Sequence, residues 1–143
     1  MKRGNRSYGI VVGIAGVLSL ALGCGDRAPT PPPGLNEAQL AGWQAYVDLN
    51  CANCHGESRK GKRSGPPLTG LAERWTADEL VRYLSDPEAV VKANPLLAYK
   101  AERYAISMPA ISGKAPGYAD KATPETLAAL AEYVLVDVST SAD

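Results

Sequence analysis

Apolar residues recur at helical spacing in four stretches of the chain, and each stretch follows a residue that can cap a helix. The pattern predicts helices over about 37–50, 77–86, 95–104 and 124–138. No stretch alternates as a β-strand would and no segment repeats, so we expect an all-α fold. The apolar faces comprise Leu40, Trp43 and Val47, flanked by Tyr46; Leu80, Val81 and Leu84; Leu97, Ala101 and Tyr104; and Leu127, Leu130, Ala131, Val134 and Val138.

The helix starts carry two kinds of signal. In a capping box, a polar residue precedes the helix and a Glu or Gln three residues later bonds back to it. In the other kind, proline follows the cap, because its fixed φ suits the first helical position. The capping boxes are Asn36 with Gln39 and Thr76 with Glu79, and the cap–proline pairs are Asn94-Pro95 and Thr123-Pro124.

The first 23 residues have the composition of an export signal. Three basic residues within the first six precede an apolar run from Tyr8 to Leu22, and a small residue follows. This run is shorter than the ~20 residues that a membrane-spanning helix needs, and glycines weaken it as a helix. We expect residues 1–23 to be a signal peptide, and an uncleaved membrane anchor is the alternative.

Cys24 follows this leader directly, in the sequence Leu-Ala-Leu-Gly-Cys. The segment resembles the lipobox of bacterial lipoproteins, whose cysteine is acylated and becomes the mature N-terminus. Ordinary cleavage that leaves a free thiol is the alternative. The proline-rich spacer from Gly25 to Gly34 is stiff and extended, which suits a tether. We therefore predict a lipid-anchor cysteine and linker over residues 24–34.

The charge of the chain excludes one class of partner. Basic and acidic residues number 15 each, but from Cys24 onward there are 12 basic and 15 acidic residues. This net negative charge gives no reason to expect nucleic-acid binding. The length of 143 residues allows one domain, and abundant proline and glycine without phenylalanine suit a small, loop-rich one.

The strongest chemical signal is the segment Cys51-Ala52-Asn53-Cys54-His55. Cys-x-x-Cys-His is the attachment motif for a c-type haem. Within one helical turn the three side chains share a face, so the thiols can form thioethers with the haem vinyl groups while the imidazole binds iron. His55 is the only histidine of the chain. We predict one haem c, attached at Cys51 and Cys54, with His55 as an iron ligand.

A Cys-x-x-Cys pair has two other interpretations, a redox-active dithiol and half of a zinc site. A zinc site needs four ligands, and Cys24 is the only other cysteine. A thioredoxin-like dithiol is typical of a sequence with strands nearby, and none is predicted. Covalent haem is the preferred interpretation, and the dithiol is the alternative.

The segment from Arg59 to Gly70 is predicted to be an ordered loop, because glycine and proline punctuate it. It contains four basic residues within five, at 59–63. These residues are either a docking patch beside an exposed haem edge or a solvated loop. A carbonyl of Pro66 or Pro67 could accept the free ring N–H of His55 and fix the orientation of the imidazole.

Met108 is the candidate for the second axial ligand of the iron. It lies 53 residues beyond His55 and is the only methionine left once the leader is removed. Pro109 biases it away from helical geometry, so its side chain should project from a loop. Core packing is the alternative role for a lone methionine. Ligation by His and Met is a known haem arrangement with a raised potential.

Together these features resemble the small single-haem, class I-like cytochromes c. The resemblance covers about Leu35 to Val138 and rests on residues 51–56, residues 65–70 and Met108-Pro109. It implies a domain over residues 35–139, in which about four to five short helices and loops wrap around one haem. In this family the first and last helices cross.

The resemblance also implies roles for individual residues. Gly42 and Tyr133 match the glycine and the aromatic residue that meet where the family's helices cross. Arg74 and Trp75 match positions that often contact the haem propionates, and Pro66 belongs to the haem surroundings.

The function implied by the resemblance is one-electron transfer in the bacterial cell envelope, without catalysis on a substrate. Its partners would be redox proteins of the envelope and, through the lipid anchor, a membrane. The protein would lie on the periplasmic side of that membrane, or in the soluble periplasm if Cys24 is not lipidated. The alternatives are a haem-bearing subunit of a larger oxidase or dehydrogenase complex and, from another class, a haem sensor or enzyme.

Overall fold

The computed structural model describes residues 29–104, 106–112, 117–118 and 120–136. The predicted signal peptide, Cys24 and Val138 lie outside these residues. The described residues form six α-helices, one short 3₁₀ helix and no strand, which confirms the all-α prediction. The helices are α1 (Glu37–Asp48), α2 (Ala52–His55), η1 (Leu71–Glu73), α3 (Ala77–Ser85), α4 (Pro87–Ala93), α5 (Pro95–Ala101) and α6 (Pro124–Leu135).

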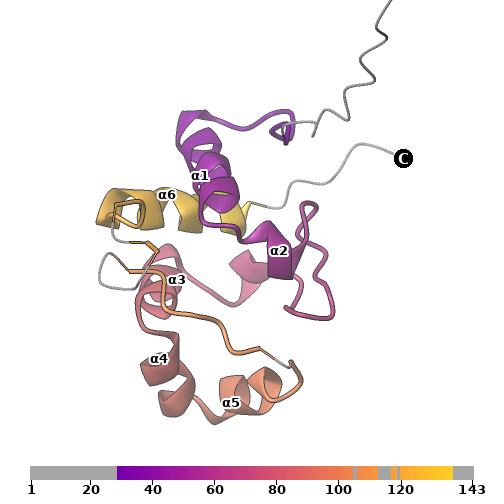
Figure 1. Ribbon diagram of the computed structural model, residues 1–143, viewed down its shortest axis with the longest axis vertical. Coiled ribbons are helices and arrows are strands. Elements are labelled where there is room, and N and C mark those ends of the chain that lie inside the picture. The colour runs from indigo at the N-terminus through magenta and orange to yellow at the C-terminus, as the bar shows by residue number, and fades with distance from the viewer. Residues whose placement is uncertain (1–28, 105, 113–116, 119, 137–143) are drawn as a thin grey trace, which may run out of the picture.

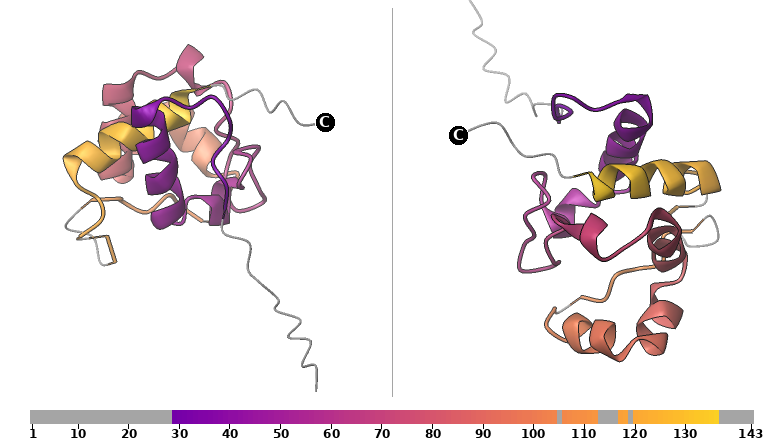
Figure 2. Two further views of the ribbon diagram at one scale, coloured as in Figure 1. Left: turned by 90° about the horizontal axis from the view of Figure 1, so that it is seen from above. Right: turned by 180° about the vertical axis from the view of Figure 1, so that it is seen from behind.

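The first and last long helices, α1 and α6, cross in direct contact (Figures 1 and 2). At the crossing, a Cβ on Gly42 would collide with the carbonyl oxygen of Ala129 and lie 2.6 Å from the Cβ of Tyr133. Only glycine lets the two backbones approach this closely. The expected meeting of Gly42 with Tyr133 is therefore confirmed.

The buried face of α1 differs from the one that the apolar pattern predicted. Leu40 is 45% exposed, and Trp43 and Val47 are only partly buried. Because Gly42 is the point of closest approach, the face that turns toward α6 is centred on it. That face consists of Gly42, Ala45 and Tyr46, with Leu49 just beyond the helix end.

The rest of the core comes mainly from α3 and α6. On α6 the predicted face is confirmed, because Leu127, Leu130, Ala131 and Val134 are buried. Helix α3 packs against α6 and buries Leu80 and Leu84. Beyond α5 the chain returns to this core, where the backbone N–H of Ile111 donates to the carbonyl of Leu84 at 2.6 Å.

The predicted helix starts are confirmed in detail, while one helix was not predicted and others end earlier than predicted. Both capping boxes form, and Asn94 and Thr123 cap α5 and α6. Helix α4 was not predicted: the Asp86 side chain accepts from the N–H of Ala89 at 3.0 Å, so Pro87 ends α3 and also starts a new helix. Helix α5 ends at Ala101, before Tyr104.

Helices α4 and α5 lie at the end of the molecule away from α1 (Figures 1 and 2). Each packs on its neighbour in sequence, α4 against α3 and α5 against α4. Among the described residues, no helix has both the length and the apolar character needed to cross a membrane.

Candidate functional site

The Cys-x-x-Cys-His segment begins where α1 ends. Asn50 adopts a left-handed conformation with φ of 58°, which asparagine tolerates better than most residues. This residue turns the chain sharply, and the N–H of Cys51 then donates back to the carbonyl of Tyr46 at 3.0 Å. The start of α2 is thereby held against the last turn of α1.

Helix α2 is a single turn that brings the three motif residues together, as the spacing predicted. The carbonyl of Cys51 accepts from the N–H of Cys54 at 3.2 Å and from the N–H of His55 at 2.9 Å. Residues at these separations lie on one helical face. Two thiols and an imidazole on one face match the donor set that a covalent haem requires.

His55 is buried, and the carbonyl of Pro66 lies 2.8 Å from its Nδ1. A carbonyl can only accept, so this contact requires the proton on Nδ1 and leaves the lone pair on Nε2. The bond also fixes the plane of the imidazole ring. The expected hydrogen bond to a proline carbonyl is therefore present, and Nε2 is the nitrogen left for a metal.

The loop after α2 is tied to the motif by several short bonds. The carbonyl of Gly56 accepts from the hydroxyl of Tyr46 at 2.7 Å, and the N–H of Gly61 donates to the carbonyl of His55 at 2.9 Å. A Cβ on Gly65 would lie 2.9 Å from the carbonyl oxygen of Cys54. The motif and the proline segment that orients His55 therefore form one rigid unit.

The two cysteines do not have the surroundings of a redox-active dithiol. Both thiols are free and partly buried, and burial raises the pKa of the Cys51 thiol to about 12. A protonated thiol is a poor nucleophile, so the dithiol alternative is disfavoured. Among the residues that the structure describes, no three His, Cys, Asp or Glu side chains cluster as metal ligands.

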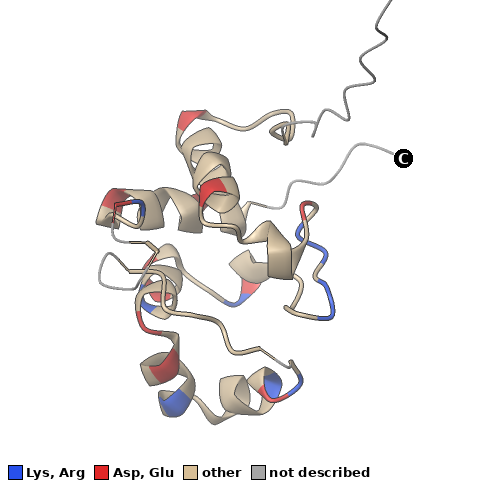
Figure 3. Cartoon of the chain, in the orientation of Figure 1, with Lys and Arg blue, Asp and Glu red and all other residues tan. Residues whose placement is uncertain are grey.

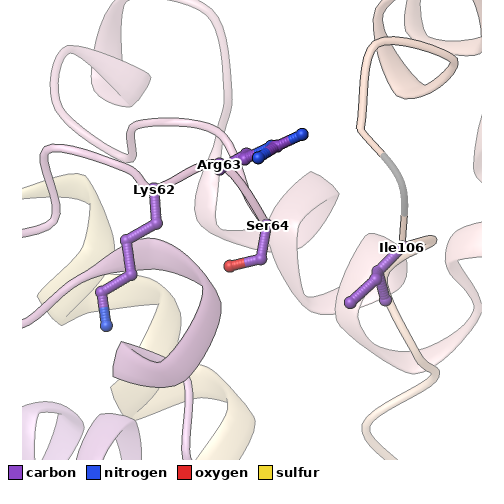
Figure 4. Close-up of a pocket in the computed structure, with 4 residues that line it drawn as sticks. All are labelled: Lys62, Arg63, Ser64 and Ile106. Atoms are coloured by element: carbon purple, nitrogen blue, oxygen red, sulfur yellow. The ribbon is translucent and has the colours of Figure 1, made fainter.

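Met108 lies in a segment without helix or strand, as predicted, and packs partly buried against the core. Ile106, two residues earlier, is 58% exposed. It lines a hollow of about 490 Å³ together with Lys62, Arg63 and Ser64 (Figure 4). Ser64 contacts the carbonyl of Cys54 at 3.4 Å, so the hollow separates the motif loop from the segment that leads to Met108. The residues that fit a haem are those of the motif, since two thiols and an oriented imidazole lie on one helical turn.

Arg74 and Trp75 follow η1 directly. Arg74 ends this helix with an exposed side chain, and Trp75 is partly buried with its ring 5.4 Å from that of Tyr83. The N–H groups of both residues donate to the carbonyl of Leu71 at 2.9 Å. Their contact with haem propionates, like the ligation of iron by Met108, stays a prediction.

Arg59 is the residue whose role sequence reasoning missed. It was grouped with its basic neighbours as part of a docking patch or solvated loop, but its side chain is only 2% exposed. Its guanidinium donates to the carbonyls of Tyr133 at 2.7 Å and of Val136 at 2.8 Å. The exposed basic loop therefore consists of Lys60, Lys62 and Arg63 alone (Figure 3). No local signal could have separated Arg59 from it.

Fold and site together define a small helical protein built to hold a covalently attached haem on a Cys-x-x-Cys-His turn. A comparison with protein families agrees, because residues 39–136 match the family described as cytochrome c. The chain belongs to the cytochrome c family. Its cofactor is haem c, and it is a haem-binding electron carrier of a kind that is typically exported from the cytoplasm. Neither the curated proteins nor the solved structures contained a match to the chain.

Proposed function

We propose that the protein is a one-electron carrier of the bacterial cell envelope, with its haem joined to Cys51 and Cys54 and its iron bound by His55 and Met108. The observation that carries this proposal is the 2.8 Å contact between Nδ1 of His55 and the carbonyl of Pro66. It supports His55 as a ligand because the imidazole is already oriented, with the correct nitrogen free.

The bound haem supplies a reversible one-electron couple at its iron. The chain positions the haem, sets its reduction potential and controls the access of water and partners to it. Burial of His55 excludes water from its side of the site, and Met108, which is partly buried against the core, would exclude water from the other side as the second ligand. Methionine ligation and apolar surroundings both favour the ferrous state, since they stabilise extra positive charge poorly.

The residues proposed to line the site beyond its ligands are Pro66, Arg74 and Trp75. Pro66 acts through its carbonyl on His55. Arg74 is an exposed cation beside the partly buried Trp75, and such a pair suits the negatively charged and planar parts of the haem at a protein surface. None of the three would take part in bond chemistry, in keeping with an electron carrier that is not an enzyme.

We propose further that Cys24 is acylated and tethers the domain to the periplasmic side of a membrane. The support is the lipobox-like leader before Cys24 and the four prolines between residues 25 and 34. The structure has a turn at residues 33–34, and the eight residues before it would span about 25 Å in a polyproline conformation. The domain could then tilt toward envelope redox partners. Mass spectrometry of the mature N-terminus, with fractionation of wild type and Cys24→Ser, tests the tether without affecting the haem assignment.

The alternative of a haem-bearing subunit in a larger complex has one observation in its favour. Leu96 and Tyr99, three residues apart on α5, are 60% and 66% exposed, so two large side chains with apolar surface stand close together on one helix. A stable partner would cover them. Purification from native membranes distinguishes the two functions, since a carrier elutes alone and a subunit elutes with its complex.

The haem assignment is tested by replacing both Cys51 and Cys54 with alanine. The wild type should retain haem through denaturing electrophoresis, and the double variant should show no haem stain. The single-site variant His55→Ala should keep the covalent stain but lose the spectrum of a low-spin, six-coordinate iron. Haem staining that survives in the double variant would refute the proposed attachment.

A further inference from the structure

Arg59 combines two features that are each unfavourable by themselves. Its guanidinium is buried, at 2% exposure, and burial of a charge without compensation is costly. Its backbone has φ of 59°, a left-handed conformation that non-glycine residues seldom adopt. A residue that keeps a side chain under both conditions has a role that a small neutral residue could not fill.

The contacts of Arg59 show what holds the charge in place. The guanidinium donates to the carbonyls of Tyr133, Val134 and Val136 at 2.7, 3.3 and 2.8 Å, and it lies 4.6 Å from the centre of the Tyr133 ring. Helix α6 has no basic residue in its own last turn, so Arg59 supplies the cation that a helix C-terminus favours. These partners are backbone dipoles and an aromatic ring, and among the described residues none of them is a carboxylate.

A short chain of contacts joins this cation to the haem attachment turn. The ring of Tyr133 meets the ring of Tyr46 edge-on, with centres 5.6 Å apart. The hydroxyl of Tyr46 donates to the carbonyl of Gly56, next to His55, at 2.7 Å. The guanidinium of Arg59 is therefore joined to the carbonyl next to His55 through two tyrosine side chains in edge-on contact and one hydrogen bond.

We propose that Arg59 is a positioning residue that also raises the reduction potential of the haem: it joins the attachment turn to α6, and its buried charge disfavours the ferric state. The proposal rests on the proposed haem attachment at Cys51 and Cys54. Oxidation adds one positive charge at the iron, and a fixed cation nearby in a medium of low dielectric constant opposes that step. Water and salt cannot screen a charge that they do not reach.

Three variants of the haem-loaded protein test this inference by redox titration. Arg59→Met removes the charge but keeps most of the side-chain volume, and it should shift the one-electron equilibrium about tenfold toward oxidation, a fall of about 59 mV. Arg59→Lys keeps the charge and should lie near the wild-type potential, although it loses the forked hydrogen bonds. Lys60→Met removes the exposed charge of the adjacent residue, and at high salt it should shift the one-electron equilibrium by less than twofold.

Two further variants keep the test decisive. Arg59→Gly relieves the left-handed backbone and removes the charge, so it should show the lowered potential even if Arg59→Met folds poorly. Asp137 follows Val136 in the sequence and lies outside the described residues. To remove any contribution of its carboxylate, the effect of Arg59→Met is also measured in a protein that carries Asp137→Asn. The fall in potential should persist there.

The inference is overturned if Arg59→Met and Arg59→Gly, which remove the charge, retain a His–Met spectrum and the wild-type potential, or if Lys60→Met lowers the potential as much as Arg59→Met. Lower stability in every Arg59 variant with no change in potential would leave only a structural role and would likewise overturn it. A wild type without covalent haem would instead refute the proposed function itself, before any Arg59 variant is compared.

Discussion

Replacing Gly42 with alanine adds one methyl group at the crossing of α1 and α6. The new Cβ would lie 2.6 Å from the Cβ of Tyr133 and would collide with the carbonyl oxygen of Ala129. Both atoms are fixed to the α6 backbone, so neither can rotate away and the helices must separate. Overpacking of this kind costs about 1–3 kcal/mol. In an exposed helix interior the same substitution would instead stabilise by about 0.5–1 kcal/mol.

The net effect expected for Gly42→Ala is a loss of about 1–2 kcal/mol in the free energy of unfolding, which lowers Tm by roughly 4–16 °C in a domain of this size. Guanidinium and thermal denaturation of the haem-loaded protein, followed by circular dichroism, measure it. Ala41→Gly is the matched control on the exposed side of α1 and should cost about 1 kcal/mol through helix propensity alone. A Gly42→Ala variant as stable as the wild type, or more stable, would refute the close approach of the two helices.

Three other substitutions have defined outcomes. Tyr46→Phe removes the 2.7 Å hydrogen bond to the carbonyl of Gly56, which still accepts from the N–H of Arg59 at 3.1 Å, and should cost about 0.5–1.5 kcal/mol in denaturation experiments. Met108→Ala should lower the reduction potential and let carbon monoxide bind, as measured by redox titration and difference spectra. Hydrogen bonds from the backbone and side chain of Thr76 lower the pKa of the Glu79 carboxylate from 4.5. The ionised Glu79 carboxylate therefore stabilises the fold above about pH 4.5, and this stabilisation is lost as the pH falls through the lowered pKa. Glu79→Gln should weaken the acid dependence of stability.

Each of these outcomes has a control or a contrary result. Tyr99→Phe changes a tyrosine that is 66% exposed and should leave stability unchanged, so equal losses in both tyrosine variants would contradict the role of the Gly56 bond. A wild type that already binds carbon monoxide would remove Met108 as a firm ligand and strengthen the sensor or enzyme alternative. For Glu79, an unaltered pH profile in the glutamine variant would show that the capping box does not hold the carboxylate in solution.

Features that depend on a few neighbouring residues could be predicted from the sequence. A capping box needs only a polar residue and a Glu or Gln three positions later, and both predicted boxes form. The cysteines and histidine of the attachment turn likewise occupy one helical face because of their spacing alone. The carbonyl on His55 was also foreseen, since the nearby Pro66-Pro67 pair offers acceptors and no competing donors.

Features that depend on distant partners could not be predicted in the same way. Arg59 bonds to carbonyls 74 to 77 residues further along the chain, and a cluster of basic residues gives no hint of such a partner. The buried face of α1 was misjudged for a related reason. The largest apolar side chains mark a probable face, but the fit of Gly42 against α6 decides the actual one. Helix α4 was missed because Pro87 was treated only as the end of α3.

The pairing of α1 with α6 also has a consequence for the order of events in biogenesis. The two helices that close the core stand at opposite ends of the domain, so their contact cannot form until the whole domain has been synthesised. A chain that emerges N-terminus first presents Cys51 and Cys54 well before α6 exists to cover Tyr46 and bind Arg59. The thiols are therefore most accessible to an attachment enzyme during this interval. Covalent modification can precede burial, and docking of α6 then closes the structure around a finished site.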